Sequence, residues 1–280
     1  MITFANNNFI SLKIDAEKGE GPDLVKQYKI PGYPTLIFVN ADGNEIDRII
    51  GYRPVDEFLA EIKRINNNRG TIGNLTDQLK ANPQNDSLLL KLAEKWEDRG
   101  SHTSALKYWE MLLNQGENYD ELAQVKIAQN KTKIENTPEF LIELINNHLD
   151  NKYTADAYRS LRSYYRSEHD TISEAKTYQN LVTLLLETDK VSAGDLNGYA
   201  WRMTQLELQL DDALEKIRQA VVMIADEDDE TQAQTMDTEA EVLWKLGKYE
   251  KAINVIDKCI LLQPEDDYYQ TQKEKFRSAL

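Results

Sequence analysis

Side chains that could carry covalent or acid–base chemistry are few in this sequence and lie far apart. It holds one cysteine, Cys259, and three histidines, His102, His148 and His169. A single thiol forms no internal disulfide and no cysteine-based zinc site, and none of the histidines belongs to an H-x3-H or HExxH pair. We therefore expect no catalytic residue, no metal site and no cofactor. Cys259 falls on the inward face of a predicted helix, so we expect a buried core thiol.

Motifs for phosphate binding, ester hydrolysis and calcium binding are also missing. The sequence has no Gly-rich phosphate loop and no Gly-x-Ser-x-Gly turn. The acidic run 226–230 lacks the Gly and the bidentate Glu of a calcium loop, so we interpret it as a solvated turn. Three triplets fit the glycosylation pattern, beginning at Asn74, Asn85 and Asn130. Two of them lie near predicted helix starts, where capping explains them.

The composition indicates a chain with a real core and an acidic surface. Hydrophobic residues make up 41% and charged residues 29%, and no apolar run approaches the ~18 residues of a membrane span. The net charge is −15, of which residues 1–70 carry only −1. Because so acidic a surface repels phosphate backbones and anionic lipids, we expect neither nucleic acid nor a membrane as a partner.

Near the C-terminus the residue spacing is typical of a helical hairpin. Five residues fall at the offsets of a tetratricopeptide unit, a helix–turn–helix of ~34 residues: Ala240, Gly247, Tyr249, Ala252 and Pro264. The two alanines are small because the helices cross closely there. Gly247 ends the first helix, and Pro264 cannot continue the second. One such unit cannot bury its own apolar face, so others must stack on it.

Further hairpins are predicted upstream, and together they resemble a tetratricopeptide-repeat domain. Gly100 matches Gly247 and Ala105 matches Ala252, which gives a second clear unit. Three less regular helix pairs are expected over residues 119–149, 153–187 and 195–224. A short polar helix at 267–279 is expected to cap the array, which has about five repeats in all.

Residues 1–66 predict a small α/β piece. The expected elements are a strand at Phe9–Ile14, a helix at Asp23–Lys29, strands at Leu36–Val39 and Glu45–Ile50 around an Asp42-Gly43 turn, and a helix that starts at Arg53-Pro54.

This order of elements resembles the second half of a thioredoxin-family domain. The matching motifs are Ile14-Asp15, Tyr28-Lys29-Ile30, Gly32-Tyr33-Pro34-Thr35, Asp42-Gly43 and Gly51-Tyr52. The resemblance implies a cis peptide bond before Pro34, next to a redox-active Cys-x-x-Cys. The half of the fold that carries those cysteines would lie before Met1, and thiol–disulfide chemistry needs both thiols. We therefore expect no oxidoreductase activity from this chain.

The expected fold class is mostly α, an α-solenoid of tetratricopeptide-like hairpins preceded by a small truncated α/β thioredoxin-like subdomain. The predicted domains are 1–66 for the thioredoxin-like part, 67–84 for a linker and adaptor helix, and 85–280 for the repeats.

A partner is expected on the inner surface of the solenoid, which the first helix of each unit lines. In the last unit this places Gln234, Asp237, Glu241 and Trp244 inward. The acidic pair disfavours a carboxylate ligand and favours a basic or amphipathic peptide or protein. The alternative is that the acids are simply solvated and that Trp244 packs within its repeat. The predicted partner-binding residues are Tyr33, Pro34, Gln234, Asp237, Glu241 and Trp244.

Two functions fit the sequence. The first is a non-catalytic scaffold that binds a peptide or protein through the groove; the second is a fragment of a thiol–disulfide oxidoreductase with a repeat extension. The chain as it stands is expected in the cytoplasm, and in the periplasm if a signal and a thioredoxin half lie upstream. Because Leu36–Val39 is apolar throughout, its free edge predicts either pairing with Phe9–Ile14 or a homodimer, with disorder of residues 1–20 as the alternative.

Overall fold

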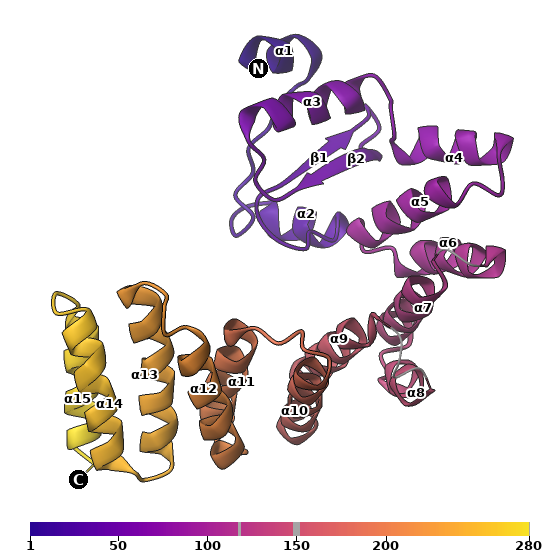
Figure 1. The fold of residues 1–280 in the computed structure, drawn as a ribbon. Helices are drawn as coiled ribbons and strands as arrows, with labels where there is room; N and C mark the ends of the chain where they lie inside the picture. Colours follow the sequence, from indigo (N-terminus) through magenta and orange to yellow (C-terminus); the bar gives the residue numbers. More distant parts are fainter. Residues whose placement is uncertain (117–118, 148–151, 280) are drawn as a thin grey trace. The chain divides into compact units, whose positions relative to one another are not determined.

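A computed structural model describes residues 1–116, 119–147 and 152–279 (Figure 1). The chain divides into two compact units, Met1–Leu144 and Ile145–Leu280. His148, and the end of the helix predicted to reach residue 149, lie outside the described residues.

Unit 1 begins with the small α/β piece. Its elements are α1 (Ile2–Asn8), α2 (Gly21–Gln27), β1 (Thr35–Val39), β2 (Glu45–Ile50) and α3 (Val55–Asn66). The two strands form an antiparallel hairpin with Thr35 opposite Ile50, and α3 runs alongside it (Figure 1). The turn is closed by Asn40, whose side chain accepts hydrogen bonds from the Asp42 and Asn44 amides, and Gly43 adopts a φ of +78°. The predicted Asp-Gly hairpin is therefore confirmed.

The strand predicted at Phe9–Ile14 is wrong. These residues form no strand, because the described sheet contains only β1 and β2. Ile10 is 95% and Leu12 80% exposed, and only Phe9 packs inward, with its ring centroid 5.4 Å from that of Phe38. Alternating apolar residues favour a strand, but a strand also needs a hydrogen-bonding neighbour, which β1 does not provide. The expected re-pairing with β1 does not occur.

The adaptor helix and the first repeat helices complete unit 1. They are α4 (Ile72–Ala81), α5 (Asp86–Asp98), α6 (His102–Gln115) and α7 (Asp120–Glu135). Thr71 caps α4 and Asn85 caps α5, each accepting a backbone hydrogen bond, so capping explains the triplet at Asn85. Asn130 is 1% exposed within α7. A continuous core joins α4 to α7 and includes Leu89, Ala93 and Trp109, all 0% exposed.

The α/β piece is fastened directly to the first hairpin. Arg48 of β2 donates to the backbone carbonyls of Tyr28 and Asp98, at 2.8 and 2.6 Å. Lys29 donates to the carbonyl of Gly100 at 3.0 Å. These contacts cross the linker region predicted to separate the two parts, and they make α5 a support for β2.

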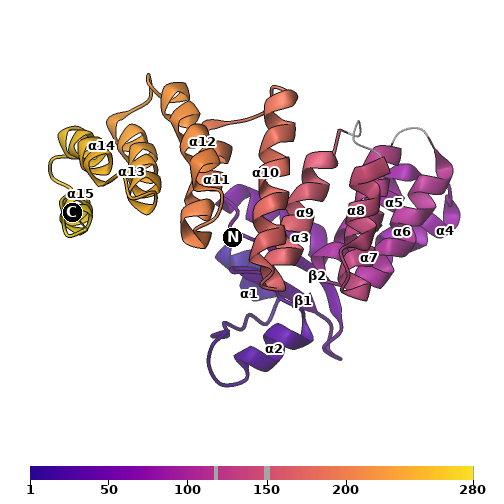
Figure 2. The same ribbon diagram turned by 90° about the horizontal axis from the view of Figure 1, so that it is seen from below.

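Unit 2 consists of helical hairpins. α8 (Glu139–Asn147) spans the boundary, and the remaining helices are α9 (Thr154–Ser167), α10 (Thr171–Glu187), α11 (Ala193–Leu206), α12 (Leu210–Met223), α13 (Asp229–Lys245), α14 (Tyr249–Leu262) and α15 (Asp267–Arg277). Helices α9 and α10, α11 and α12, and α13 and α14 pair as antiparallel neighbours (Figure 2).

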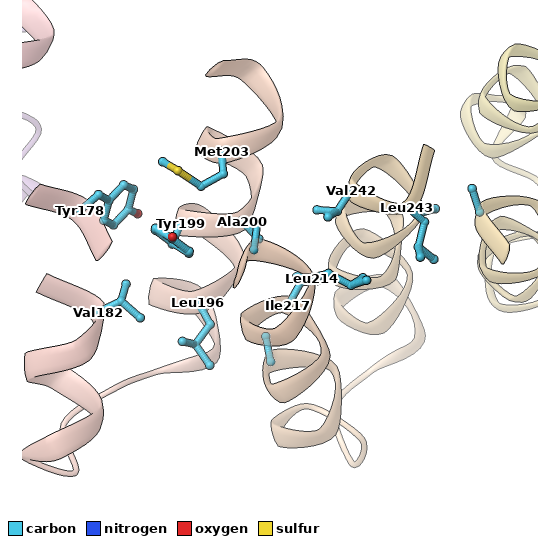
Figure 3. Packing of buried hydrophobic residues seen from close by; sticks show 14 of the residues in the cluster. Tyr178, Val182, Leu196, Tyr199, Ala200, Met203, Leu214, Ile217, Val242 and Leu243 are labelled. Atoms are coloured by element: carbon cyan, nitrogen blue, oxygen red, sulfur yellow. The ribbon is translucent and has the colours of Figure 1, made fainter. Parts of the chain in front are cut away.

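The core of unit 2 has small residues where helices cross and large ones between hairpins. Ala240 and Ala252 of the last hairpin are both 0% exposed, as the repeat spacing predicts. Figure 3 shows Tyr178 of α10 facing Tyr199 of α11, with ring centroids 5.3 Å apart at 88°. Gly247 has a φ of +70°, a conformation that suits glycine at the end of a helix.

The expected fold class is confirmed. An α-solenoid of helical hairpins follows a small α/β piece, and the hairpins have the predicted small residues and glycine stops. Over the described residues, no helix combines the length and apolar character needed to cross a bilayer.

Candidate partner-binding surface

The residues predicted to face inward in the last hairpin lie on one side of α13. Asp228 caps this helix, and Gln234, Asp237, Glu241 and Trp244 follow at steps of three or four residues. Gln234 is exposed and Trp244 is half-buried, but Asp237 and Glu241 are only 8% and 6% exposed. Two carboxylates are therefore withdrawn from water on this helix, and each needs a partner.

The C-terminal helix α15 supplies those partners. The Tyr268 hydroxyl donates a hydrogen bond to Asp237 Oδ2 at 3.0 Å. Lys275 Nζ lies 2.9 and 2.7 Å from the two carboxylate oxygens of Glu241. In Figures 1 and 2, α13, α14 and α15 lie together at the C-terminal end of unit 2. α15 packs its backbone against α14 and reaches α13 with long side chains.

Trp244 completes the contact with α15. Its ring centroid lies 6.0 Å from that of Phe276, and Lys275 Nζ lies 4.3 Å from the Trp244 ring centroid. Lys275 is thus held between a carboxylate and an indole face, by an ion pair and a cation–π contact.

Burial dominates the electrostatics of Asp237. It raises the pKa of this carboxyl to about 6, an effect that Glu241 adds to and that Tyr268 and Lys275 oppose. Oδ1 of Asp237 and Nε1 of Trp244 are buried without a hydrogen-bond partner. The contact with α15 therefore gives both carboxylate oxygens of Glu241 a hydrogen-bond partner, but it gives a partner to only one oxygen of Asp237 and to neither that carboxyl's Oδ1 nor the Trp244 nitrogen.

An inner acid of unit 1 is also paired within the chain. Glu97 of α5 accepts hydrogen bonds from Trp109 at 3.1 Å, from Asn130 at 2.7 Å and from Lys126 of α7 at 2.8 Å. His102 Nδ1 lies 2.9 Å from Asn130 Oδ1, and burial lowers the pKa of the imidazole. This network links successive helices and makes His102 a structural residue.

Tyr33 and Pro34 belong to unit 1, apart from the α13 surface in unit 2. The peptide bond between them is cis, as the resemblance implied. Both residues are exposed, Tyr33 at 66%. The structure brings together Asp237, Glu241 and Trp244 on one helix of unit 2, whereas these two residues belong to unit 1.

Groups for covalent or metal chemistry do not gather anywhere in the described ranges, where no cluster of three His, Cys, Asp or Glu side chains could hold a metal ion. Cys259 is 0% exposed, its Sγ donates to the carbonyl of Ala233, and burial raises the pKa of the thiol to about 12. The expected buried core thiol is confirmed.

Sequence reasoning missed the α15 side of this surface. The final helix reads as a polar cap, yet Tyr268, Lys275 and Phe276 share one face because they are seven and eight residues apart. The aromatic residues of this otherwise charged helix were the available signal.

Comparison with known families settles the nature of the α/β piece. A family described as "Thioredoxin-like domain" matches residues 4–66. Residues 4–66 are thioredoxin-like. The exposed cis Tyr33–Pro34 bond and the β1–β2 hairpin lie within this thioredoxin-like piece.

Several solved structures are similar to the chain at low identity. BtubC (BKLC) from P. vanneervenii is 13% identical, with a TM-score of 0.48 over 76% of this chain and 92% of that one. A tetratricopeptide repeat protein from Parabacteroides merdae is 13% identical, with a TM-score of 0.46 over 69% and 73%. A putative kinesin light chain with TPR-like repeats from Podosopora anserina is 13% identical, with a TM-score of 0.45 over 65% and 96%. No curated protein matches the chain.

Proposed function

We propose that this chain is a non-catalytic scaffold that holds a basic or amphipathic segment of another protein on the inner helices of unit 2. One observation carries the proposal. The acidic pair of α13 already receives a lysine and a tyrosine from α15, so this surface has the chemistry to hold a basic aromatic helix. A partner of the same character suits the neighbouring inner helices, which expose Gln234 of α13 and Trp201 of α11 beside this covered pair.

The uncovered part of the surface extends from α13 to α11, which pack against each other. Trp201 follows the buried Ala200 as Glu241 follows Ala240, so it occupies the same place in its hairpin, and it is 39% exposed. Lys245 of α13 pairs at 2.6 Å with Glu207, the residue that follows α11. An exposed tryptophan suits a partner with aromatic and basic side chains, since its ring face attracts cations and tryptophan is a frequent anchor of interfaces.

The burial of the single thiol is consistent with a binding role. The one thiol of the chain is in the core of unit 2, and its raised pKa keeps it protonated at neutral pH. Tyr33 and Pro34 stay predicted contact residues, for a second point of attachment on the thioredoxin-like piece.

The scaffold function can be tested with a fluorescein-labelled amphipathic peptide of lysine, leucine and tryptophan, titrated against the full chain at physiological salt. Trp201→Ala and Gln234→Glu alter the uncovered surface, while Val222→Ala is a matched change at a 75%-exposed position of α12. We expect Trp201→Ala to weaken binding by about 1–2 kcal/mol and Val222→Ala to have no effect. Equal affinities in all variants, or no binding at all, would overturn the proposal.

A second candidate rests on the family match and the cis Tyr33–Pro34 bond. The chain would then be a piece of a thiol–disulfide oxidoreductase, inactive alone because it lacks a second cysteine. A Cys-x-x-Cys encoded in frame upstream of Met1, with reductase turnover of the longer product, would support it. An upstream sequence without that motif would exclude it.

A further inference from the structure

The helix that covers this part of α13 is α15, and few of its own residues are buried. α15 buries Tyr269 and Phe276 in the core of unit 2, contacts α13 through Tyr268 and Lys275, and pairs Lys273 with Asp257 of α14. Lys275 keeps 37% of its side chain exposed. Segments with few buried apolar contacts open at a lower free energy than the rest of a fold, so α15 is suited to detach while the hairpins stay folded.

α15 also leaves polar atoms of α13 without hydrogen-bond partners. α15 gives Glu241 two short hydrogen bonds but leaves Asp237 Oδ1 and the Trp244 indole nitrogen buried without partners. Unpaired buried polar atoms cost free energy that a better-matched ligand recovers. A helix that adds a donor for Asp237 and an acceptor for Trp244 would bind this surface better than α15 does.

We propose that the covered face of α13 is a recognition site for an amphipathic helix of another protein, and that α15 is a resident helix that this partner displaces. The partner carries an aromatic residue followed, seven and eight positions later, by a lysine and a second aromatic, in the order of Tyr268, Lys275 and Phe276. This inference rests on the proposed scaffold function. It adds a second binding site on the same surface, which becomes accessible only when α15 is displaced.

The probe for this site is a labelled synthetic peptide spanning residues 266–279 of the chain itself. It is titrated against the full wild-type chain and against a full-length variant, Lys275→Ala with Phe276→Ala, whose own α15 is loosened. An apparent affinity falls in proportion to the fraction of molecules with a free site, so we expect the variant to bind about tenfold tighter. Adding Glu241→Lys to the variant should remove the gain, as should Lys275→Glu in the peptide.

Two results would overturn the inference: a loosened variant that binds the peptide no tighter than wild type, or a gain that survives Glu241→Lys. Because Phe276 is a core residue and its loss could unfold the hairpin, hydrogen exchange on the wild-type chain provides an independent measurement. Excess unlabelled peptide should speed exchange in α15 and protect α13. Unchanged exchange in α15 would also overturn the inference.

The two proposals fail separately. The uncovered surface is tested at Trp201 and Gln234 with α15 in place, and the covered site is tested at Glu241 with α15 released. If Trp201→Ala has no effect but the loosened variant binds through Glu241, the scaffold surface as proposed is wrong and the covered site stands. If Trp201→Ala weakens binding but the loosened variant binds the peptide no tighter than wild type, the scaffold surface stands and α15 is a permanent cap.

Discussion

Lys95 Nζ lies 2.7 Å from Asp47 Oδ1, which pairs the first repeat helix with the second strand of the thioredoxin-like piece. Asp47 is 2% exposed, and its other oxygen accepts from Arg64 of α3 at 2.8 Å. One carboxylate thus ties together a strand, the helix beside it and a helix of the solenoid. This explains why the thioredoxin-like piece and the first hairpins form a single compact unit.

Removal of this carboxylate should destabilise unit 1. Asp47→Ala leaves Lys95 and Arg64 without their shared buried partner, and we expect a loss of about 3 kcal/mol in the free energy of unfolding measured in urea. Asp77→Ala is the matched control, because Asp77 and Lys80 form an exposed pair at 76% and 73% exposure. Its effect should stay within about 0.5 kcal/mol. Equal losses in both variants would show that the buried network does not hold the unit together.

A larger side chain at the point where the two helices of the last hairpin cross should destabilise the hairpin. Ala252 is 0% exposed, so Ala252→Leu forces α13 and α14 apart at an expected cost of about 1–3 kcal/mol. Leu261→Ala, at an 80%-exposed position of α14, serves as the control. An unchanged melting temperature for Ala252→Leu would contradict the repeat register.

The stability of unit 2 should depend on the ionisation of Asp237. Burial raises the pKa of this carboxyl to about 6, so the folded chain retains a proton that the unfolded chain releases above about pH 4. The stabilising contribution is complete below about pH 4 and is lost as the pH rises through 6. Between pH 5 and 7 the free energy of unfolding, measured in urea, should fall by about 1 kcal/mol more for the wild type than for Asp237→Asn. Asp226→Asn, on an exposed turn, should behave as wild type. A parallel pH dependence for Asp237→Asn would contradict the assignment.

Thiol chemistry should be absent from the folded chain. Cys259 is buried and burial raises its pKa to about 12, so we expect no insulin reduction with dithiothreitol above background. Labelling by an aromatic disulfide reagent should require denaturant. Turnover that vanishes in Cys259→Ala would contradict this expectation.

The free edge of β1 should associate with a second copy. Leu36 and Val39 are 37% and 45% exposed, and in the described sheet β1 pairs only with β2. An unpaired apolar edge is a template for another strand, so light scattering should detect a concentration-dependent dimer that Leu36→Lys weakens. Ile172→Lys, at a 73%-exposed site on α10, is the control. A monomer at all concentrations would exclude the edge dimer.

Local signals were sufficient to predict several elements closely. The bounds of β2 match the sequence prediction because an Asp-Gly turn precedes this strand, and α4 lies within the predicted adaptor region 67–84, between Thr71 and Pro83. The irregular segment at Phe9–Ile14 could not be predicted in the same way. Its alternation is a local property, whereas a strand depends on a neighbour that the tertiary structure must supply.

The covering of α13 was also beyond local reasoning. The spacing of Asp237, Glu241 and Trp244 correctly places them on one helix face, but it does not indicate what lies against that face. Lys275 follows Glu241 by 34 residues, and their pairing depends on where the turn after α14 directs the chain. Pairings of this kind arise from packing of successive hairpins and leave only a faint pattern in the sequence.

The acid–lysine pairs give the row of inner helices a direction. Glu97 of α5 receives Lys126 from the next inner helix, and Glu241 of α13 receives Lys275 from the helix that follows its hairpin. In both cases the earlier helix contributes the acid and the later one the base. A hairpin with this polarity can adjoin a copy of itself on either side. Duplication of the gene segment for such a hairpin would therefore lengthen the array without requiring a new interface to evolve.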